Sequence, residues 1–116
     1  AVVVGGDDDL SVRLAREIAS AVDTEATTSP DWSGRAPGEG GDATVVAAYR
    51  SLVSAGGTAV AVTSRRGLLS VLAEVLGTPV ERFWALATAP GSLSAVEVWE
   101  DGSASVAFTN RTDHLA

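Results

Sequence analysis

The sequence predicts an α/β protein, a three-layer α/β/α sandwich with a mixed, mostly parallel sheet. Two short apolar runs, residues 2–4 and 58–63, are each followed by an amphipathic helix pattern, which is typical of parallel strands and their crossover helices. Near the C-terminus, two alternating segments flank Glu100-Asp101-Gly102, which predicts an antiparallel hairpin. With 116 residues, the chain is expected to form a single domain, residues 1–116.

Composition excludes several classes of function. The net charge is −7, with 15 acidic against 8 basic residues, which argues against a nucleic-acid or anionic-membrane surface because both need clustered positive charge. The absence of cysteine removes disulfides and thiolate chemistry. No apolar run approaches the ~18 residues of a membrane span, and no signal-peptide pattern is visible. We therefore expect a cytoplasmic protein without a cofactor, and the alanine-rich, lysine-free composition suggests a bacterial one.

The first half of the chain predicts a strand, a helix, a loop and a second helix. The helix over residues 10–22 has an apolar stripe, whereas Arg13, Arg16 and Glu17 face water. Residues 23–42 are the least structured part by sequence, and Asp42 is expected to cap the next helix, which Gly56 and Gly57 end. The apolar stripe of the first helix consists of Val12, Ala15, Ile18, Ala19 and Val22.

Residues 57–84 are the stretch around which the rest is organised. A buried strand over residues 58–63 meets a sharp junction at Ser64-Arg65-Arg66, and an amphipathic helix follows until Gly77. The sequence Thr78-Pro79-Val80-Glu81 then has the form of a capping box. The apolar residues of the helix are Leu68, Leu69, Leu72, Val75 and Leu76.

Right-handed crossovers place the first and third strands side by side with their carboxyl ends together. This brings residues 5–9 and 64–66 into one cleft, and ligands of open α/β sheets bind at such an edge.

Motifs in the last two thirds of the chain resemble the histidine phosphatase, or phosphoglycerate mutase-like, superfamily. Where that family has Ser-His-Gly after a strand, this chain has Thr63-Ser64-Arg65, and its helix closes with Leu76-Gly77. The tail, Ser92-Leu93-Ser94 and then a hairpin and residues 110–115 (NRTDHL), is similar to the family's closing motif.

The resemblance implies a shortened, degenerate member that lacks both catalytic histidines. The family's first strand ends in Arg-His-Gly, and the matching triplet here is Gly5-Gly6-Asp7, while the second histidine falls on Ser64. Arg35 matches a phosphate ligand only weakly, and Glu39 is a poor match to the general acid. The expected function is a non-catalytic binding or structural module. The candidate ligand-binding residues are Gly5, Gly6, Asp7, Asp8, Arg35, Ser64, Arg65, Arg66 and His114.

Other interpretations remain open at this point. An enzyme of another type could reuse the cleft, with Asp7, Asp8, Ser64, Arg65 and His114 as its functional set. Arg65 and Arg66 at a helix start could hold a small anion. Consecutive aspartates do not all point one way, so helix capping explains residues 7–9 better than a metal site does. His114, the only histidine, is expected to fix the tail.

Three tryptophans predict self-association. Trp32 and Trp99 fall in a loop and at a hairpin end, where a small monomer would leave them partly wet, and Trp84 is the third. Exposed aromatic surface of this kind marks interfaces, and a two-fold dimer is the commonest way to cover it. We therefore expect a homodimer, with a small anion or another protein as further partners.

Overall fold

The computed structural model describes residues 2–33, 41–78, 82, 86 and 88–115. The chain forms two compact units, Ala1–Leu68 and Leu69–Ala116. Both contain helix and strand, so the predicted α/β class is confirmed.

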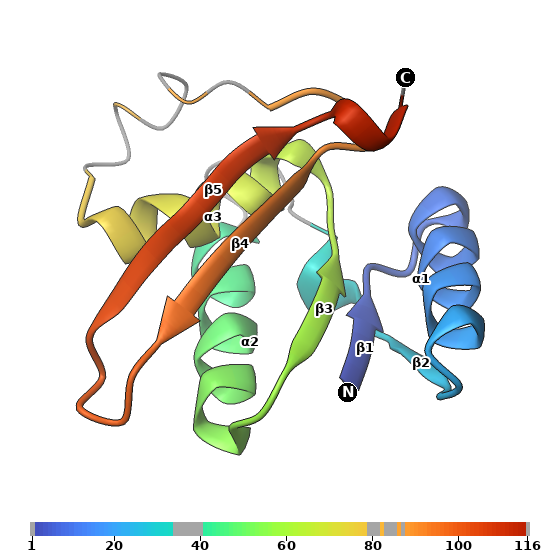
Figure 1. The fold of residues 1–116 in the computed structure, drawn as a ribbon, viewed down its shortest axis with the longest axis horizontal. Coiled ribbons are helices and arrows are strands. Elements are labelled where there is room, and N and C mark those ends of the chain that lie inside the picture. Colours follow the sequence, from blue (N-terminus) through green and yellow to red (C-terminus); the bar gives the residue numbers. More distant parts are fainter. Residues whose placement is uncertain (1, 34–40, 79–81, 83–85, 87, 116) are drawn as a thin grey trace. The chain divides into compact units, whose positions relative to one another are not determined.

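The first unit is built on a parallel sheet of three strands in the order β2-β1-β3 (Figure 1). Val3 of β1 pairs with Ala26 of β2 and with Val60 of β3, so the predicted neighbourhood of the first and third strands is confirmed. The elements are β1 (Val2–Gly5), α1 (Asp9–Ala21), β2 (Ala26–Thr28), the 3-10 helix η1 (Pro30–Trp32), α2 (Gly41–Ala55) and β3 (Ala59–Val62).

The two crossover connections of this unit run in opposite directions across the sheet, from β1 outward to β2 and from β2 back past β1 to β3. Because right-handed crossovers lead from β1 to β2 on one side and from β2 across to β3 on the other, they require α1 and α2 on opposite faces of the sheet. Figure 1 shows the three strands between these two helices. Under α1, Val3, Ala15 and Ala19 form the buried core, and their small alanine side chains let the helix lie close to the strands.

The helix boundaries agree with the capping signals except at α2. Asp8 is the N-cap of α1, as predicted for the aspartate run. The helix α2 begins at Gly41, so Asp42 is its second residue, and the prediction that Asp42 precedes the helix as its cap was wrong. Gly56, with φ of +74°, ends α2, because glycine adopts the left-handed conformation without a Cβ clash.

The helix α3 (Arg65–Leu76) begins at the predicted junction and ends at Gly77, whose φ is +67°. Leu69 is buried and Leu72 is 1% exposed, as the predicted stripe requires. Leu76, however, is 50% exposed, so its assignment to that stripe was wrong: it lies in the last turn, next to the end of the helix. The predicted capping box falls partly on residues 79–81, outside the described residues.

The second unit carries the predicted hairpin, β4 (Leu93–Val98) and β5 (Ala104–Arg111). Along β5 half-buried and exposed residues alternate, as expected for a strand with one wet face. Among the described strands, β4 and β5 pair only with each other, so the parallel and antiparallel strands form two sheets where the sequence predicts one mixed sheet. A closing 3-10 helix, η3 (Asp113–Leu115), follows β5.

The tryptophans differ from expectation. Trp32 is only 5% exposed, because it lies in η1, which packs against α2, and its carbonyl accepts a hydrogen bond from the Thr63 hydroxyl. Trp99 is exposed as predicted, and Trp84 lies outside the described residues.

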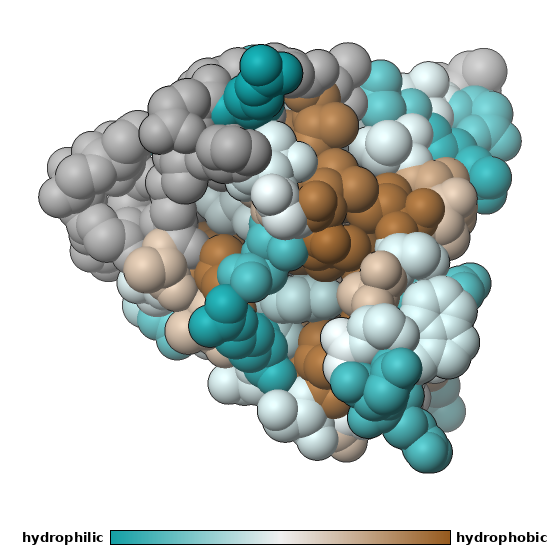
Figure 2. All heavy atoms as spheres, turned by 90° about the vertical axis from the view of Figure 1, so that its left-hand side faces the viewer, coloured by the Kyte–Doolittle hydropathy of each residue, from teal (hydrophilic) through white to brown (hydrophobic). Residues whose placement is uncertain are grey.

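Other apolar residues also reach the surface, and Figure 2 shows some of them among hydrophilic ones. None of the helices in the described part of the chain is long and apolar enough to cross a membrane.

Candidate functional site at the carboxyl edge of the parallel sheet

The three parallel strands end together in the first unit. The Gly6 N–H donates to the Val62 carbonyl at 2.9 Å, and the Ser29 N–H donates to the Gly5 carbonyl at 2.9 Å. Residues 5–9 and 64–66 therefore follow neighbouring strands at one edge of the sheet, as predicted from the crossover rule.

Asp7 and Asp8 are both engaged in holding this edge together. Asp7 Oδ1 accepts a hydrogen bond of 2.7 Å from the Ser33 hydroxyl, and Asp8 Oδ2 accepts one of 3.1 Å from the Ser11 N–H. Hydrogen bonds from the Ser11 side chain and backbone lower the pKa of the Asp8 carboxyl, which keeps it charged at the positive end of the α1 dipole. Both carboxylates thus accept hydrogen bonds from the protein itself, and a ligand would have to replace these bonds.

Ser64 caps α3. Its hydroxyl accepts a hydrogen bond of 3.2 Å from the Gly67 N–H, and its carbonyl accepts one of 2.9 Å from the Leu68 N–H. This is the N-cap geometry that serine adopts at helix starts. The sequence interpretation of Ser64 as a small polar residue left where a histidine was lost missed this capping role, although serine between a strand and the start of an amphipathic helix is a recognised cap signal.

Gly6 is buried where a side chain has no room. A Cβ at this position would lie 3.1 Å from Asp8 Oδ1 and 3.3 Å from both Ser33 Oγ and the Trp32 carbonyl oxygen. These distances are tighter than ordinary van der Waals contact, so even alanine would have to push these groups aside. Gly5 is similarly enclosed, since its Cβ would meet Ala15 Cβ at 3.2 Å.

The remaining predictions for this edge concern the arginines and a metal site. Arg65 and Arg66 are the first two residues of α3. Arg35 and Glu39 lie outside the described residues. Within the described ranges, no group of three or more His, Asp or Glu side chains could hold a metal ion.

His114 belongs to the second unit, where the closing motif ties the tail down. His114 Nε2 donates to the Gly91 carbonyl at 2.8 Å, and Asn110 Oδ1 accepts a 2.7 Å hydrogen bond from the Ala89 N–H. The Arg111 guanidinium lies 3.9 Å from the centre of the Phe108 ring. These contacts fix the segment before β4 to the end of β5, in line with the tail-fixing role expected for His114.

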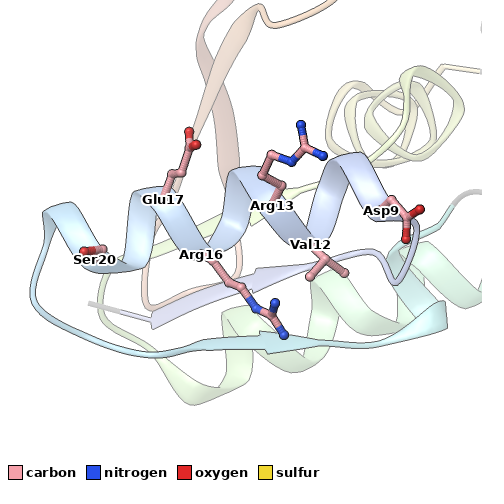
Figure 3. Close-up of a pocket in the computed structure, with 6 residues that line it drawn as sticks. All are labelled: Asp9, Val12, Arg13, Arg16, Glu17 and Ser20. Atoms are coloured by element: carbon pink, nitrogen blue, oxygen red, sulfur yellow. The ribbon is translucent and has the colours of Figure 1, made fainter.

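One surface feature was not anticipated from the sequence. An open depression of about 510 Å³ runs along α1, and the described residues that line it all belong to that helix (Figure 3). They come from two neighbouring rows of side chains, spaced four residues apart along each row. The residues are Asp9, Arg13 and Glu17 in one row and Val12, Arg16 and Ser20 in the other.

Comparison with protein-family models and with curated proteins gives no match.

Proposed function

We propose that the chain is a non-catalytic module, a shortened relative of the histidine phosphatases that acts through its surface. The observation that carries the proposal is the packing of Gly6. The phosphohistidine mechanism needs an imidazole nucleophile at the end of the first strand. This position holds a buried glycine, and a Cβ added to it would meet Asp8, Ser33 and the Trp32 carbonyl, so the packing supports an edge without space for that side chain.

The second position of the mechanism supports the same conclusion. Ser64 uses its hydroxyl oxygen as the acceptor that caps α3. A serine nucleophile also needs a base beside it, and His114, the only histidine of the chain, has Nε2 engaged by the Gly91 carbonyl. The polar groups around Gly6 and Ser64 therefore serve folding, and we propose that the surviving function is binding, with a second copy of the chain as the first partner.

Residual binding of a small anion is the alternative function. It is favoured by the position of α1 and α3, which both start at the carboxyl edge, and by Arg65 and Arg66 in the first turn of α3. Against it, Asp8 and Ser64 already accept a hydrogen bond from the N–H of the third residue of α1 and α3, Ser11 and Gly67 respectively. Titration with inorganic phosphate, followed by amide NMR shifts of residues 64–67, separates the two functions.

The test of the main proposal is turnover of a chromogenic phosphate monoester by the wild-type chain and by Ser64→Ala. We expect both to remain at the buffer background, since neither has an imidazole nucleophile at this edge. Turnover by the wild type clearly above that of Ser64→Ala, in protein free of contaminating phosphatase, would overturn the proposal. Saturable phosphate shifts without turnover would favour the anion-binding alternative.

A further inference from the structure

The helix α1 carries more apolar surface than its own sheet covers. Leu10 is 73% exposed and Leu14 is 39% exposed, whereas Ile18 packs partly against the core and Val22, the C-cap residue, is half exposed. These four residues are spaced four apart and form one ridge along the helix, which we call the α1 ridge. Burial of leucine side chains stabilises proteins, so the exposed parts of Leu10 and Leu14 are apolar surface that a partner could remove from water.

A row of charges runs beside the α1 ridge. Arg13 and Glu17 belong to the next row, and in Figure 3 their side chains point to the same side of the helix. Among the described residues neither makes an ion pair. Both side chains are exposed, they carry opposite charges, and they lie one helical turn apart.

We propose that α1 is the surface through which two copies of the chain associate, packed antiparallel about a two-fold axis near the middle of the helix. In that arrangement Leu10 lies opposite the partner's Val22, and Leu14 lies opposite the partner's Ile18. Arg13 comes within one turn of the partner's Glu17, and the symmetry repeats this contact. In this register Glu17 also lies near the partner's Glu17, but the two Arg13–Glu17 contacts outnumber this like-charge contact. The ridge and its charges can therefore meet their own symmetry copy, which an isologous interface requires. The inference rests on the self-association proposed above and names its surface.

The size of the surface sets the expected affinity. A helix of 13 residues is roughly 20 Å long, so a single helix pair buries less than a standard interface. The interface is therefore weak, with association in the micromolar range, and its peripheral ion pairs contribute little each.

The first arm of the test removes apolar surface. Sedimentation velocity is run over a concentration series on the wild type, Leu10→Gln and Leu76→Gln. The two variants make the same change at exposed leucines of different helices, and circular dichroism checks that each is folded. We expect Leu10→Gln to weaken the dimer at least tenfold and Leu76→Gln to leave it within about threefold of the wild type, where tenfold corresponds to about 1.4 kcal/mol.

The second arm tests the two-fold geometry by exchanging charges. Arg13→Glu and Glu17→Arg each place like charges across the interface and should weaken association several-fold. The double variant Arg13→Glu/Glu17→Arg restores opposite charges across the axis and should return the affinity to near the wild-type value. Glu97→Arg, at an exposed position of β4, is the control for the change in net charge.

The outcomes separate the surface from self-association itself. A monomer at every concentration would overturn both this inference and the proposed self-association. A dimer that Leu10→Gln leaves intact, or one that the double charge exchange does not restore, would overturn the α1 surface alone. Neither result bears on phosphate ester turnover.

Discussion

Ser64 Oγ lies 3.2 Å from the backbone nitrogen of Gly67 and accepts its hydrogen bond, so Ser64 is the N-cap of α3. The proposed relationship to the histidine phosphatases would put a catalytic histidine at this position. Next to it, a Cβ on Gly67 would overlap the Thr63 hydroxyl, which itself donates to the Trp32 carbonyl. The end of β3, the Ser64 cap and the first turn of α3 are thus packed closely together.

Replacing the cap should cost stability. Ser64→Ala leaves the Gly67 N–H without its acceptor, and we expect the free energy of unfolding to fall by about 0.5–2 kcal/mol. Ser64→Asp, which keeps an acceptor and adds a charge favourable at a helix N-terminus, should lose little or gain stability. Urea unfolding measures both; equal losses in the two variants would contradict the capping role.

The charge on Asp8 predicts a pH dependence. Because its pKa is lowered in the folded chain, its stabilising contribution is present above the unfolded pKa, near 3.8, and is lost as the pH falls through the lower folded value. Asp8→Asn keeps the cap without a titrating group. The free energy of unfolding of the wild type, relative to that of Asp8→Asn, should therefore fall as the pH is lowered from 6 to 3 in urea unfolding. A difference independent of pH would show that the carboxylate charge contributes nothing.

Gly6 should be intolerant of any side chain. Gly6→Ala places a Cβ between Asp8, Ser33 and Trp32, and we expect a loss of about 1–3 kcal/mol from overpacking. In Gly6→Ala/Ser33→Ala the removed hydroxyl opens space, so the double variant should lose less than the sum of the two single losses. Strict additivity in thermal or urea unfolding would mean that Ser33 does not confine Gly6.

The buried and exposed leucines of α3 provide a matched pair. Leu72→Ala should cost about 2–5 kcal/mol, because it leaves a cavity in the core. Leu76→Ala removes the same atoms at a half-exposed position and should change stability by less than about 1 kcal/mol. Comparable losses in both variants would mean that the buried face of α3 is wrongly assigned.

Local signals in the sequence predicted much of the framework. Glycine after an apolar periodic run marked the ends of α2 and α3, and Asp101-Gly102 marked the hairpin turn, because each of these features depends on backbone conformation at one or two residues. The crossover rule placed β1 beside β3, although the paired residues Val3 and Val60 are far apart in the sequence. Side-chain contacts between distant residues were not predictable.

The burial of Trp32 is the clearest of these. Its position after Ser29-Pro30 indicates a short turn, but nothing local shows that this turn packs against α2 and that its carbonyl binds Thr63, 31 residues away. Ser33, the partner of Asp7, was missed for the same reason, since the two are 26 residues apart. At the candidate site, the family resemblance led to the hypothesis that two histidines are replaced, whereas the capping role of Ser64 and the close packing around Gly6 required the structure.

The absence of a phosphohistidine intermediate is the most direct test of the proposed loss of catalysis. Phosphorus NMR of the chain after incubation with a small phosphoryl donor should show no protein-bound phosphoramidate signal, in the wild type and in His114→Asn alike. The proposed relationship puts Gly6 and Ser64 at the two histidine positions of the family, and His114 is the only histidine in the sequence. A phosphoramidate signal that is present in the wild type and lost in His114→Asn would contradict the account.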